Sequence, residues 1–344
     1  MCYIFLTYMT LFIFGGTGDL ARRKIIPAFS ALRFPNLKII ALGRREFTDK
    51  MYRDFICNDK CFAGWEKKPR YEKVDFDGEI KCEECSSHLR KGEKNYFYSA
   101  LPPKTYPALL RYLGKIKKSG YPVRALIEKP FGENIRGAKE LEKISEKENL
   151  TDDLFISDHY LFKEEIIKLR KKDFKRIRIV SLEEVGLEGR IGYYDEMGAL
   201  KDMVQSHFLN IVFKLLINPE KEFGNFEVAG YERGQYGEYE KELGRKSSTE
   251  TFVRLSLQTK ERRYEFITGK GFNKKLSYLE VDGEKIILAS GRNAYERLFA
   301  DFFAGRKENF ATISGSILGW RIVEKAKRKK PGLKYYKKGI SFLG

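Results

Sequence analysis

A glycine-rich turn near the N-terminus limits the folds open to this chain more than any other feature. The run Leu11-Phe12-Ile13-Phe14 is apolar at every position, as in a strand that is buried on both faces. Gly15-Gly16-Thr17-Gly18-Asp19-Leu20 follows directly, and residues 22–32 then have a helical pattern. Such glycines let the backbone approach a pyrophosphate, whose charge the helix N-terminus stabilises. Because the spacing is G-x-x-G rather than G-x-G-x-x-G, the motif predicts a dinucleotide-binding fold only together with its context.

The rest of the first half supplies that context, because apolar strands alternate with helical segments. This alternation predicts a doubly wound parallel sheet, an α/β Rossmann-type dinucleotide-binding domain, over residues 1–157. Residues 48–94 are charged and mostly helical in pattern, with a strand expected at 71–76. The other expected strands are 37–42, 95–101, 123–127 and 154–157, and the expected helices are 104–119 and 135–148.

The pattern changes from residue 175, where short strands separated by turns replace the alternation. This change predicts an α+β domain over residues 158–344, with a mainly antiparallel sheet covered by helices. A long helix is expected at 195–216 and a polar loop at 224–246. The expected strands are 176–182, 251–258, 263–268, 276–281 and 285–288.

One apolar stripe of the expected long helix contains a histidine. Leu200, Met203, His207, Ile211 and Leu215 recur at helical spacing, which places His207 on the buried face. A single histidine on such a face is more often a core residue than a functional one. The stripe alone therefore assigns His207 no role.

Composition indicates a globular protein that attracts anions. Apolar residues make up 42% of the 344 residues, enough for two cores, and the formal net charge is +18. That charge suits phosphorylated metabolites, nucleotides, nucleic acid or acidic lipid without choosing among them. The apolar first 14 residues lack a basic leader and are too short to span a bilayer, so we expect a cytoplasmic protein without a membrane segment. Met9 directly precedes the first strand and is a second candidate for the start.

The five cysteines do not suggest a disulfide framework, because an odd number in a long chain is typical of reduced thiols. Four of them are grouped in pairs, Cys57 with Cys61 and Cys82 with Cys85, which is a loose form of zinc-ligand spacing. We expect reduced thiols here and no metal.

Polar side chains follow several of the expected strands. Ser157-Asp158-His159-Tyr160 comes directly after an apolar strand, with Lys163 close behind, and Lys129 follows another strand. Ligands bind outside the carboxyl ends of strands in an open α/β sheet, so these residues are candidates for a ligand site; a polar turn is the alternative. Arg44 and Arg45 follow the second strand, where an acid would favour NAD and an arginine favours the 2′-phosphate of NADP.

Together these segments resemble the glucose-6-phosphate dehydrogenase family. The similarity spans nearly the whole chain in the family's order. The matching segments are 15–21, 100–103, 128–132, 158–164, 186–196, 201–207, 269–275 and 294–298.

The resemblance implies that a sugar phosphate is oxidised at C1 by hydride transfer to NADP, giving a lactone. His207 matches the general base that removes the C1 hydroxyl proton, and Asp158 matches its carboxylate partner, chemistry that suits a buried imidazole near neutral pH. The residues implied for substrate binding are Lys129, His159, Tyr160, Lys163, Glu183, Asp202, Lys270 and Lys275. Those implied for NADP are Gly15, Gly16, Thr17, Gly18, Asp19, Leu20, Arg44, Arg45, Tyr106 and Lys129. The resemblance implies no metal, and a homodimer as the assembly.

The chain departs from the family pattern in three ways. Phe162 stands where the family has glycine inside the phosphate-binding turn, and Leu182-Glu183-Glu184-Val185-Gly186 keeps the family's glutamate but loses its proline. The chain is also shorter than typical members, so we expect it to lack much of the C-terminal sheet and the tail that holds a second NADP in some of them. Phe162 keeps open a different sugar dehydrogenase of the glucose-fructose oxidoreductase superfamily. The positive charge keeps open a non-catalytic nucleotide- or RNA-binding protein on the same fold.

Overall fold

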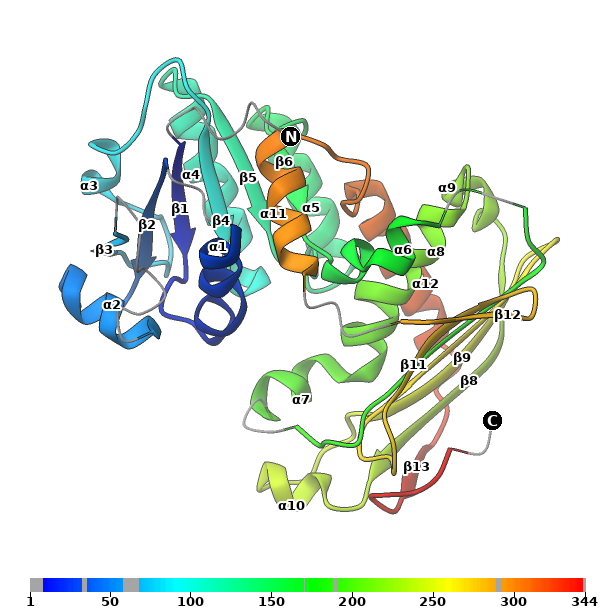
Figure 1. Cartoon of the computed structure of the whole chain (residues 1–344). Helices are drawn as coiled ribbons and strands as arrows, with labels where there is room; N and C mark the ends of the chain where they lie inside the picture. Colours follow the sequence, from blue (N-terminus) through cyan, green and yellow to red (C-terminus); the bar gives the residue numbers. More distant parts are fainter. Residues whose placement is uncertain are drawn as a thin grey trace. The chain divides into compact units, whose positions relative to one another are not determined.

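The computed structural model describes residues 9–32, 36–57, 68–169, 171, 173–187, 191–288 and 293–342 (Figure 1). Contacts divide them into two compact units. The first unit runs to Phe162 and takes in a later segment that ends at Ile313; the second begins at Lys163 and resumes at Ser314. The later segment, up to Ile313, packs with the first unit. The predicted division into residues 1–157 and 158–344 assigns this segment to the second domain instead. Within the described ranges, no helix combines the length and apolar character that a bilayer crossing requires.

The first unit contains a six-stranded parallel sheet with strand order β3-β2-β1-β4-β5-β6. This is the order of a doubly wound dinucleotide-binding domain and confirms the predicted fold class. Every residue of β1 is buried, and the Phe12 ring stacks on Phe97 of β4 with ring centroids 5.0 Å apart. The strands are β1 (Met9–Phe14), β2 (Leu37–Gly43), β3 (Arg70–Lys73), β4 (Asn95–Ser99), β5 (Val123–Ile127) and β6 (Leu154–Ile156).

Helices cover both faces of this sheet. α1 packs on α11 and α4 packs on α5, and the two pairs lie on opposite faces (Figure 1). Asn134 caps α5 because its side chain accepts the N–H of Gly137 at 2.9 Å. The helices of the first unit are η1 (Ala21–Ile25), α1 (Ile26–Leu32), α2 (Asp49–Cys57), α3 (Glu83–Ser86), η3 (Pro103–Thr105), α4 (Tyr106–Lys118), α5 (Ile135–Lys147), η4 (His159–Phe162) and α11 (Ala294–Ala304).

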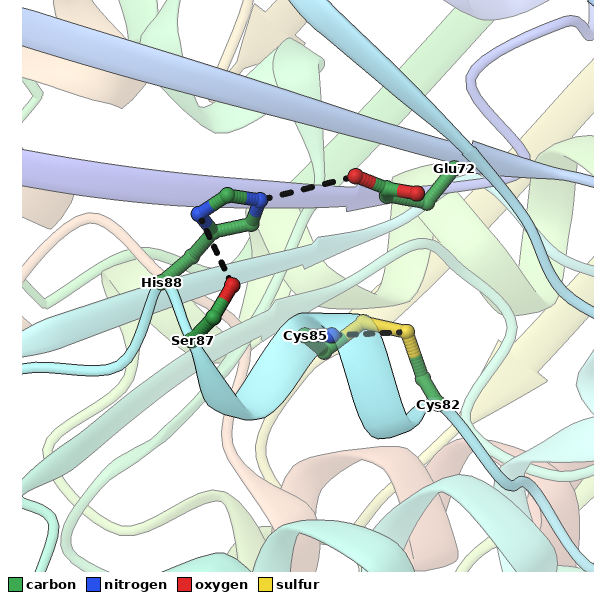
Figure 2. Close-up of a disulfide and its surroundings, with 5 residues drawn as sticks. All are labelled: Glu72, Cys82, Cys85, Ser87 and His88. Atoms are coloured by element: carbon green, nitrogen blue, oxygen red, sulfur yellow. Dashed lines mark hydrogen bonds and ion pairs between the residues drawn. A yellow bond between two sulfur atoms is a disulfide. The ribbon is translucent and has the colours of Figure 1, made fainter.

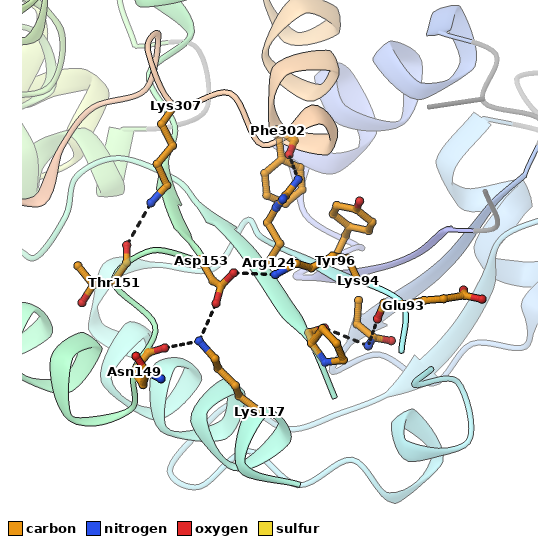
Figure 3. Close-up of polar contacts among 12 residues, drawn as sticks. Glu93, Lys94, Tyr96, Lys117, Arg124, Asn149, Thr151, Asp153, Phe302 and Lys307 are labelled. Carbon is orange, nitrogen blue, oxygen red and sulfur yellow. Dashed lines mark hydrogen bonds and ion pairs between the residues drawn. The ribbon is translucent and has the colours of Figure 1, made fainter. Parts of the chain in front are cut away.

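Helix α11 is held in the first unit by its C-terminal end. Arg124 of β5 donates to the carbonyl oxygens of Phe302 and Phe303, at 3.1 and 2.8 Å (Figure 3). The Phe299 ring packs on Phe29 of α1, with centroids 4.3 Å apart. Nearby, Asp153 accepts from two lysines and ties the start of β6 to the rest of the unit (Figure 3). Distant parts of the chain thus complete one core.

The second unit contains a seven-stranded mixed sheet with strand order β12-β11-β7-β10-β9-β8-β13. Four of its pairings are antiparallel, and β10 with β7 and β13 with β8 are parallel, so the mainly antiparallel prediction is confirmed. The strands are β7 (Arg176–Leu182), β8 (Glu227–Tyr236), β9 (Phe252–Gln258), β10 (Arg263–Gly269), β11 (Leu276–Val281), β12 (Glu284–Ile287) and β13 (Leu333–Tyr336).

Two of these strands fall outside the expected ones. The predicted polar loop 224–246 is wrong over β8, whose glycines and charged residues hide a strand pattern. β8 nevertheless pairs with β9 along its length and with β13 on the other side, and neither pairing is visible in local sequence.

The predicted helix 195–216 is broken into three pieces. These are α7 (Ile191–Ala199), the π-helix η5 (Leu200–Phe208) and α8 (Leu209–Leu215). Gly198 has a φ of 68°, which kinks the chain near the end of α7, and the π-helical turn shifts the buried face, so Met203 is only half-buried. The continuous stripe is therefore wrong at Met203, although His207 is buried as predicted. The other helices of this part of the chain are α6 (Glu164–Ile167), α9 (Pro219–Glu222), α10 (Tyr239–Leu243) and α12 (Ile313–Lys327).

One cysteine pair forms a disulfide. Cys82 and Cys85 are bonded across α3, with their Cα atoms 5.2 Å apart (Figure 2). The expectation of reduced thiols is therefore wrong for this pair, because the short helix brings both within bridging distance. Disulfide sulfurs are not thiolate ligands, which removes this pair from the candidate zinc set. Cys61 and the side chain of Cys57 lie outside the described residues.

Candidate active site

The glycine turn after β1 is fastened tightly to β2. The N–H groups of Gly15 and Gly16 both donate to the carbonyl oxygen of Leu42, each at 2.9 Å. Gly15 has a φ of 78°, and a Cβ on Gly16 would lie 2.8 Å from the Cβ of Ala41. Side chains are therefore excluded at both positions, and the backbone before η1 remains open to a ligand's approach.

Two arginines follow β2 beside this turn. Arg44 is exposed and lies 3.4 Å from Asp77, while the Arg45 guanidinium lies over the Phe55 ring, 4.8 Å from its centroid. Asp19, in the turn itself, pairs with Arg23 at 2.6 Å. Glu46 is paired with Lys73. The end of β2 thus presents two cations where a dinucleotide fold meets the adenosine ribose.

A buried carboxyl group follows β5. Glu128 is 8% exposed and accepts the Tyr98 hydroxyl at 2.7 Å. Burial raises the pKa of Glu128, and the hydrogen bond from Tyr98 partly offsets that rise. The Tyr106 hydroxyl donates to the Glu128 carbonyl at 2.7 Å, and its side chain is completely buried. Tyr106 therefore supports the segment that carries Lys129 from within the core.

The predicted phosphate-binding turn follows β6. Asp158 is completely buried and accepts the N–H of Tyr160 at 3.0 Å. The His159 ring lies edge-on to Tyr160, with centroids 5.1 Å apart. Lys163 is also buried, at 7% exposure. Phe162 is fully buried against Phe310, with centroids 4.9 Å apart, so its bulk enters the core.

Tyr295 of α11 is a site residue that the sequence interpretation missed. Its ring stacks on His159, with centroids 5.6 Å apart and planes 13° from parallel. Burial raises the pKa of Tyr295, and the charges of Glu128 and Asp158 raise it further. The segment 294–298 was noticed only as a family match, and nothing local in it predicts contact with a residue 136 positions earlier.

In the second unit, two neighbouring parallel strands bring a glutamate and a lysine together. β7 and β10 run parallel, with Leu182 opposite Gly269, so Glu183 and Lys270 follow at the same end and form an ion pair. Lys270 also lies over the Tyr194 ring, 5.5 Å from its centroid. Lys275 precedes β11, whose first residue pairs with Leu182, and its side chain is exposed.

Tyr194 links this ion pair to the π-helix. It is buried, and its pKa is raised by burial first and then by Asp202, with Glu183 a smaller contributor. Asp202 is half-buried on η5, and His207 is 2% exposed on the same helix. The i→i+5 bonding of a π-helix makes Asp202 and His207 neighbours on successive turns. Glu183, Lys270 and Asp202 thus gather around one tyrosine.

Comparisons with known proteins agree with these features. The model for "Glucose-6-phosphate dehydrogenase, NAD binding domain" matches residues 12–167, and the model for "Glucose-6-phosphate dehydrogenase, C-terminal domain" matches residues 164–229. Glucose-6-phosphate 1-dehydrogenase of Buchnera aphidicola is 32% identical over 234 residues, which cover 59% of this chain and 48% of that protein. The enzyme of Dickeya dadantii is 27% identical over 362 residues, covering 84% and 72%. The first of these matches spans only about half of the relative's length.

Solved structures share the fold. A structure of glucose-6-phosphate dehydrogenase with its substrate glucose 6-phosphate has a TM-score of 0.78 at 21% identity and covers 97% of this chain and 95% of that chain. Glucose-6-phosphate 1-dehydrogenase from Mycobacterium avium has a TM-score of 0.80 at 20% identity, covering 97% and 94%. The strand order and the glycine turn of the first unit define a dinucleotide-binding domain, and the second unit contains a mixed sheet. With both family models matched in order, the chain belongs to the glucose-6-phosphate dehydrogenase family.

Proposed function

We propose that this protein oxidises glucose 6-phosphate at C1 to 6-phosphogluconolactone, with NADP as the hydride acceptor. The observation that carries the proposal is the shared edge of the parallel sheet in the first unit. The glycine turn after β1, Lys129 after β5 and the Asp158 segment after β6 all follow carboxyl ends of strands in one sheet. Membership of the family supports the choice of reaction.

The chemical step needs a base, because hydride leaves C1 easily only as the C1 hydroxyl loses its proton. In this mechanism His207 accepts the proton of the C1 hydroxyl. The π-helix holds its side chain in a buried position. Asp158 has the role of stabilising the imidazolium that forms. Its carboxylate is completely buried, where an opposite charge interacts more strongly than it does in water.

The remaining residues orient the sugar phosphate. His159, Tyr160 and Lys163 hold the 6-phosphate through charge-assisted hydrogen bonds. Glu183 and Asp202 accept sugar hydroxyls, and Lys129, Lys270 and Lys275 contact the substrate. The ion pair between Glu183 and Lys270 holds both side chains at one strand end before a substrate arrives.

The glycine turn fits a dinucleotide. A side chain at Gly15 would be strained, and one at Gly16 would collide with Ala41. The turn therefore has no side chains at these positions, as the close approach of a pyrophosphate requires. Thr17, Gly18, Asp19 and Leu20 continue this turn into η1. Arg44 and Arg45 supply positive charge for a 2′-phosphate. When bound, NADP supplies the hydride acceptor.

For the assembly, a homodimer remains a prediction.

The structure weakens the case for a different sugar dehydrogenase. Phe162 was the feature that favoured it, and its ring is buried against Phe310 instead of filling the phosphate turn.

The test is reduction of NADP, and separately NAD, by the purified protein with glucose 6-phosphate and then with unphosphorylated glucose. We expect NADP reduction that requires the 6-phosphate. A folded protein that binds NADP but turns over neither sugar would overturn the proposal.

A further inference from the structure

The second unit contains a polar cavity of about 460 Å³. Its walls come from the kink between α7 and η5, from β8, from the segment before β9 and from the end of α12. None of its lining residues has a role in the proposed reaction. The volume is that of a site for a small molecule rather than for a single ion.

Four cationic side chains converge on this cavity from three elements. Lys201 comes from η5, Arg233 from β8, and Lys327 and Lys330 from the end of α12 and the turn after it. Cations so arranged repel one another unless an anion lies among them. The folding of distant segments thus concentrates positive charge at one place.

The acids in the lining offset only part of this charge, because Asp195 is held by a cation outside the lining and Glu250 faces Arg233. Asp195 pairs with Arg245 and accepts the Tyr239 hydroxyl at 2.8 Å. Glu250 accepts the N–H of Leu200 at 3.2 Å and lies 4.0 Å from Arg233. Glu196 is exposed at the rim.

Two observations show that the cations lack full compensation. The Nε of Arg233 is buried and has no hydrogen-bond partner among the described residues. The pKa of Lys327 lies below its ordinary value because burial removes water and because Lys201 is near, and Glu250 and Glu324 offset only part of this fall. An anion in the cavity would add a charge partner for the Arg233 guanidinium and favour the charged form of Lys327.

We infer that this cavity binds a small phosphorylated molecule at a site separate from that of the proposed substrate. Several phosphate oxygens can accept from the lysines and the guanidinium together. Ser248, Thr249 and Tyr231 add hydroxyl groups to the lining for the rest of the ligand. The inference does not depend on the proposed reaction.

The test is isothermal titration calorimetry of the full chain with sodium pyrophosphate. The wild-type protein is expected to bind it, and Lys327→Gln/Lys330→Gln is expected to weaken binding at least about tenfold by removing two charge-assisted contacts. The matched control is Lys334→Gln/Lys337→Gln, which removes the same charge from exposed positions outside the lining. The control should change the affinity less than about twofold.

A third variant separates this site from the proposed phosphate turn. Lys163→Ala is expected to leave pyrophosphate binding intact. The inference is overturned if the wild type does not bind pyrophosphate, if both double variants bind equally, or if Lys163→Ala abolishes binding. None of the lysines changed in the double variants belongs to a hydrophobic core, so folding is not at risk.

Discussion

Glu128 and Glu183 each follow the carboxyl end of a strand, one in each unit, but their surroundings are opposite. Glu128 is buried and bonded to the Tyr98 hydroxyl, and its pKa is raised. Glu183 is half-exposed and paired with Lys270. The first unit therefore holds its acid by neutral hydrogen-bond donors within a core, and the second holds its acid by an opposite charge. We therefore expect Glu128 to hold its own segment rigidly and Glu183 to contact the substrate.

The largest effect is expected at His207 in the second unit. His207→Asn keeps a polar side chain of similar size but removes the proposed base, so kcat should fall about 10²- to 10⁴-fold with little change in the KM for glucose 6-phosphate. Steady-state NADP reduction measures both constants. His88→Asn is the matched control, because His88 lies beside Glu72 and has no proposed role. A raised KM at unchanged kcat would remove the assignment of His207 as base.

Lys270 tests the charged side of the comparison. Lys270→Met removes the charge that pairs with Glu183 and that we propose contacts the substrate, so the KM for glucose 6-phosphate should rise about 10- to 100-fold. Lys274→Met, at an exposed neighbouring position, is the control. Equal kinetics for the two variants would show that Lys270 does not reach the substrate.

Tyr295 tests whether the first unit positions its proposed phosphate-binding residues through packing. Tyr295→Ala removes the ring stacked on His159, and the KM for glucose 6-phosphate should rise about 2- to 10-fold. Tyr295→Phe keeps the ring and should restore the KM. If Tyr295→Phe is as impaired as Tyr295→Ala, the hydroxyl matters rather than the stacking.

The smallest effect concerns stability and pH. Folding raises the pKa of Glu128 and so favours its protonated form. Below the ordinary glutamate pKa of about 4.3 this carboxyl is protonated in both the folded and the unfolded state, so it costs the protein no folding stability there. As pH rises through the folded-state pKa, the wild type loses about 1.4 kcal/mol for each unit of the shift. Glu128→Gln cannot ionise and should avoid this loss, which urea unfolding across that pH range measures.

Glu183→Gln is the control for the Glu128 experiment. It breaks the ion pair with Lys270, so no gain in stability is expected as pH rises. If both variants gain alike, the contrast between the two glutamates is wrong.

Much of the first unit could be predicted because its signals are local. β5 was placed at its observed bounds, and the glycine turn, Lys129 and Asp158 were found as residues that follow strands. In a parallel sheet the carboxyl ends of the strands meet at one edge, so chain order alone indicated that these residues share it. Tyr295 could not be predicted in this way, because the return of α11 depends on contacts between distant segments.

The second unit shows the limit of local signals. β8 was missed because its charged and glycine-rich residues gain their strand conformation from β9 and β13. The break at Gly198 was missed because 3.6-residue periodicity continues through it in the sequence. The pairing of Glu183 with Lys270 depends on β7 and β10 running parallel, which no turn between them encodes.

The sequence by itself determined the alternation of strands and helices, the glycine turn and the chemical groups at the strand ends, because these depend on residues close together in the chain. Only the tertiary structure decided the disulfide between Cys82 and Cys85, the burial of Phe162, the stacking of Tyr295 on His159 and the gathering of Lys201, Arg233 and Lys327 around one cavity. The physical reason is that burial and charge proximity depend on which surfaces pack together, and packing joins residues that local pattern cannot connect.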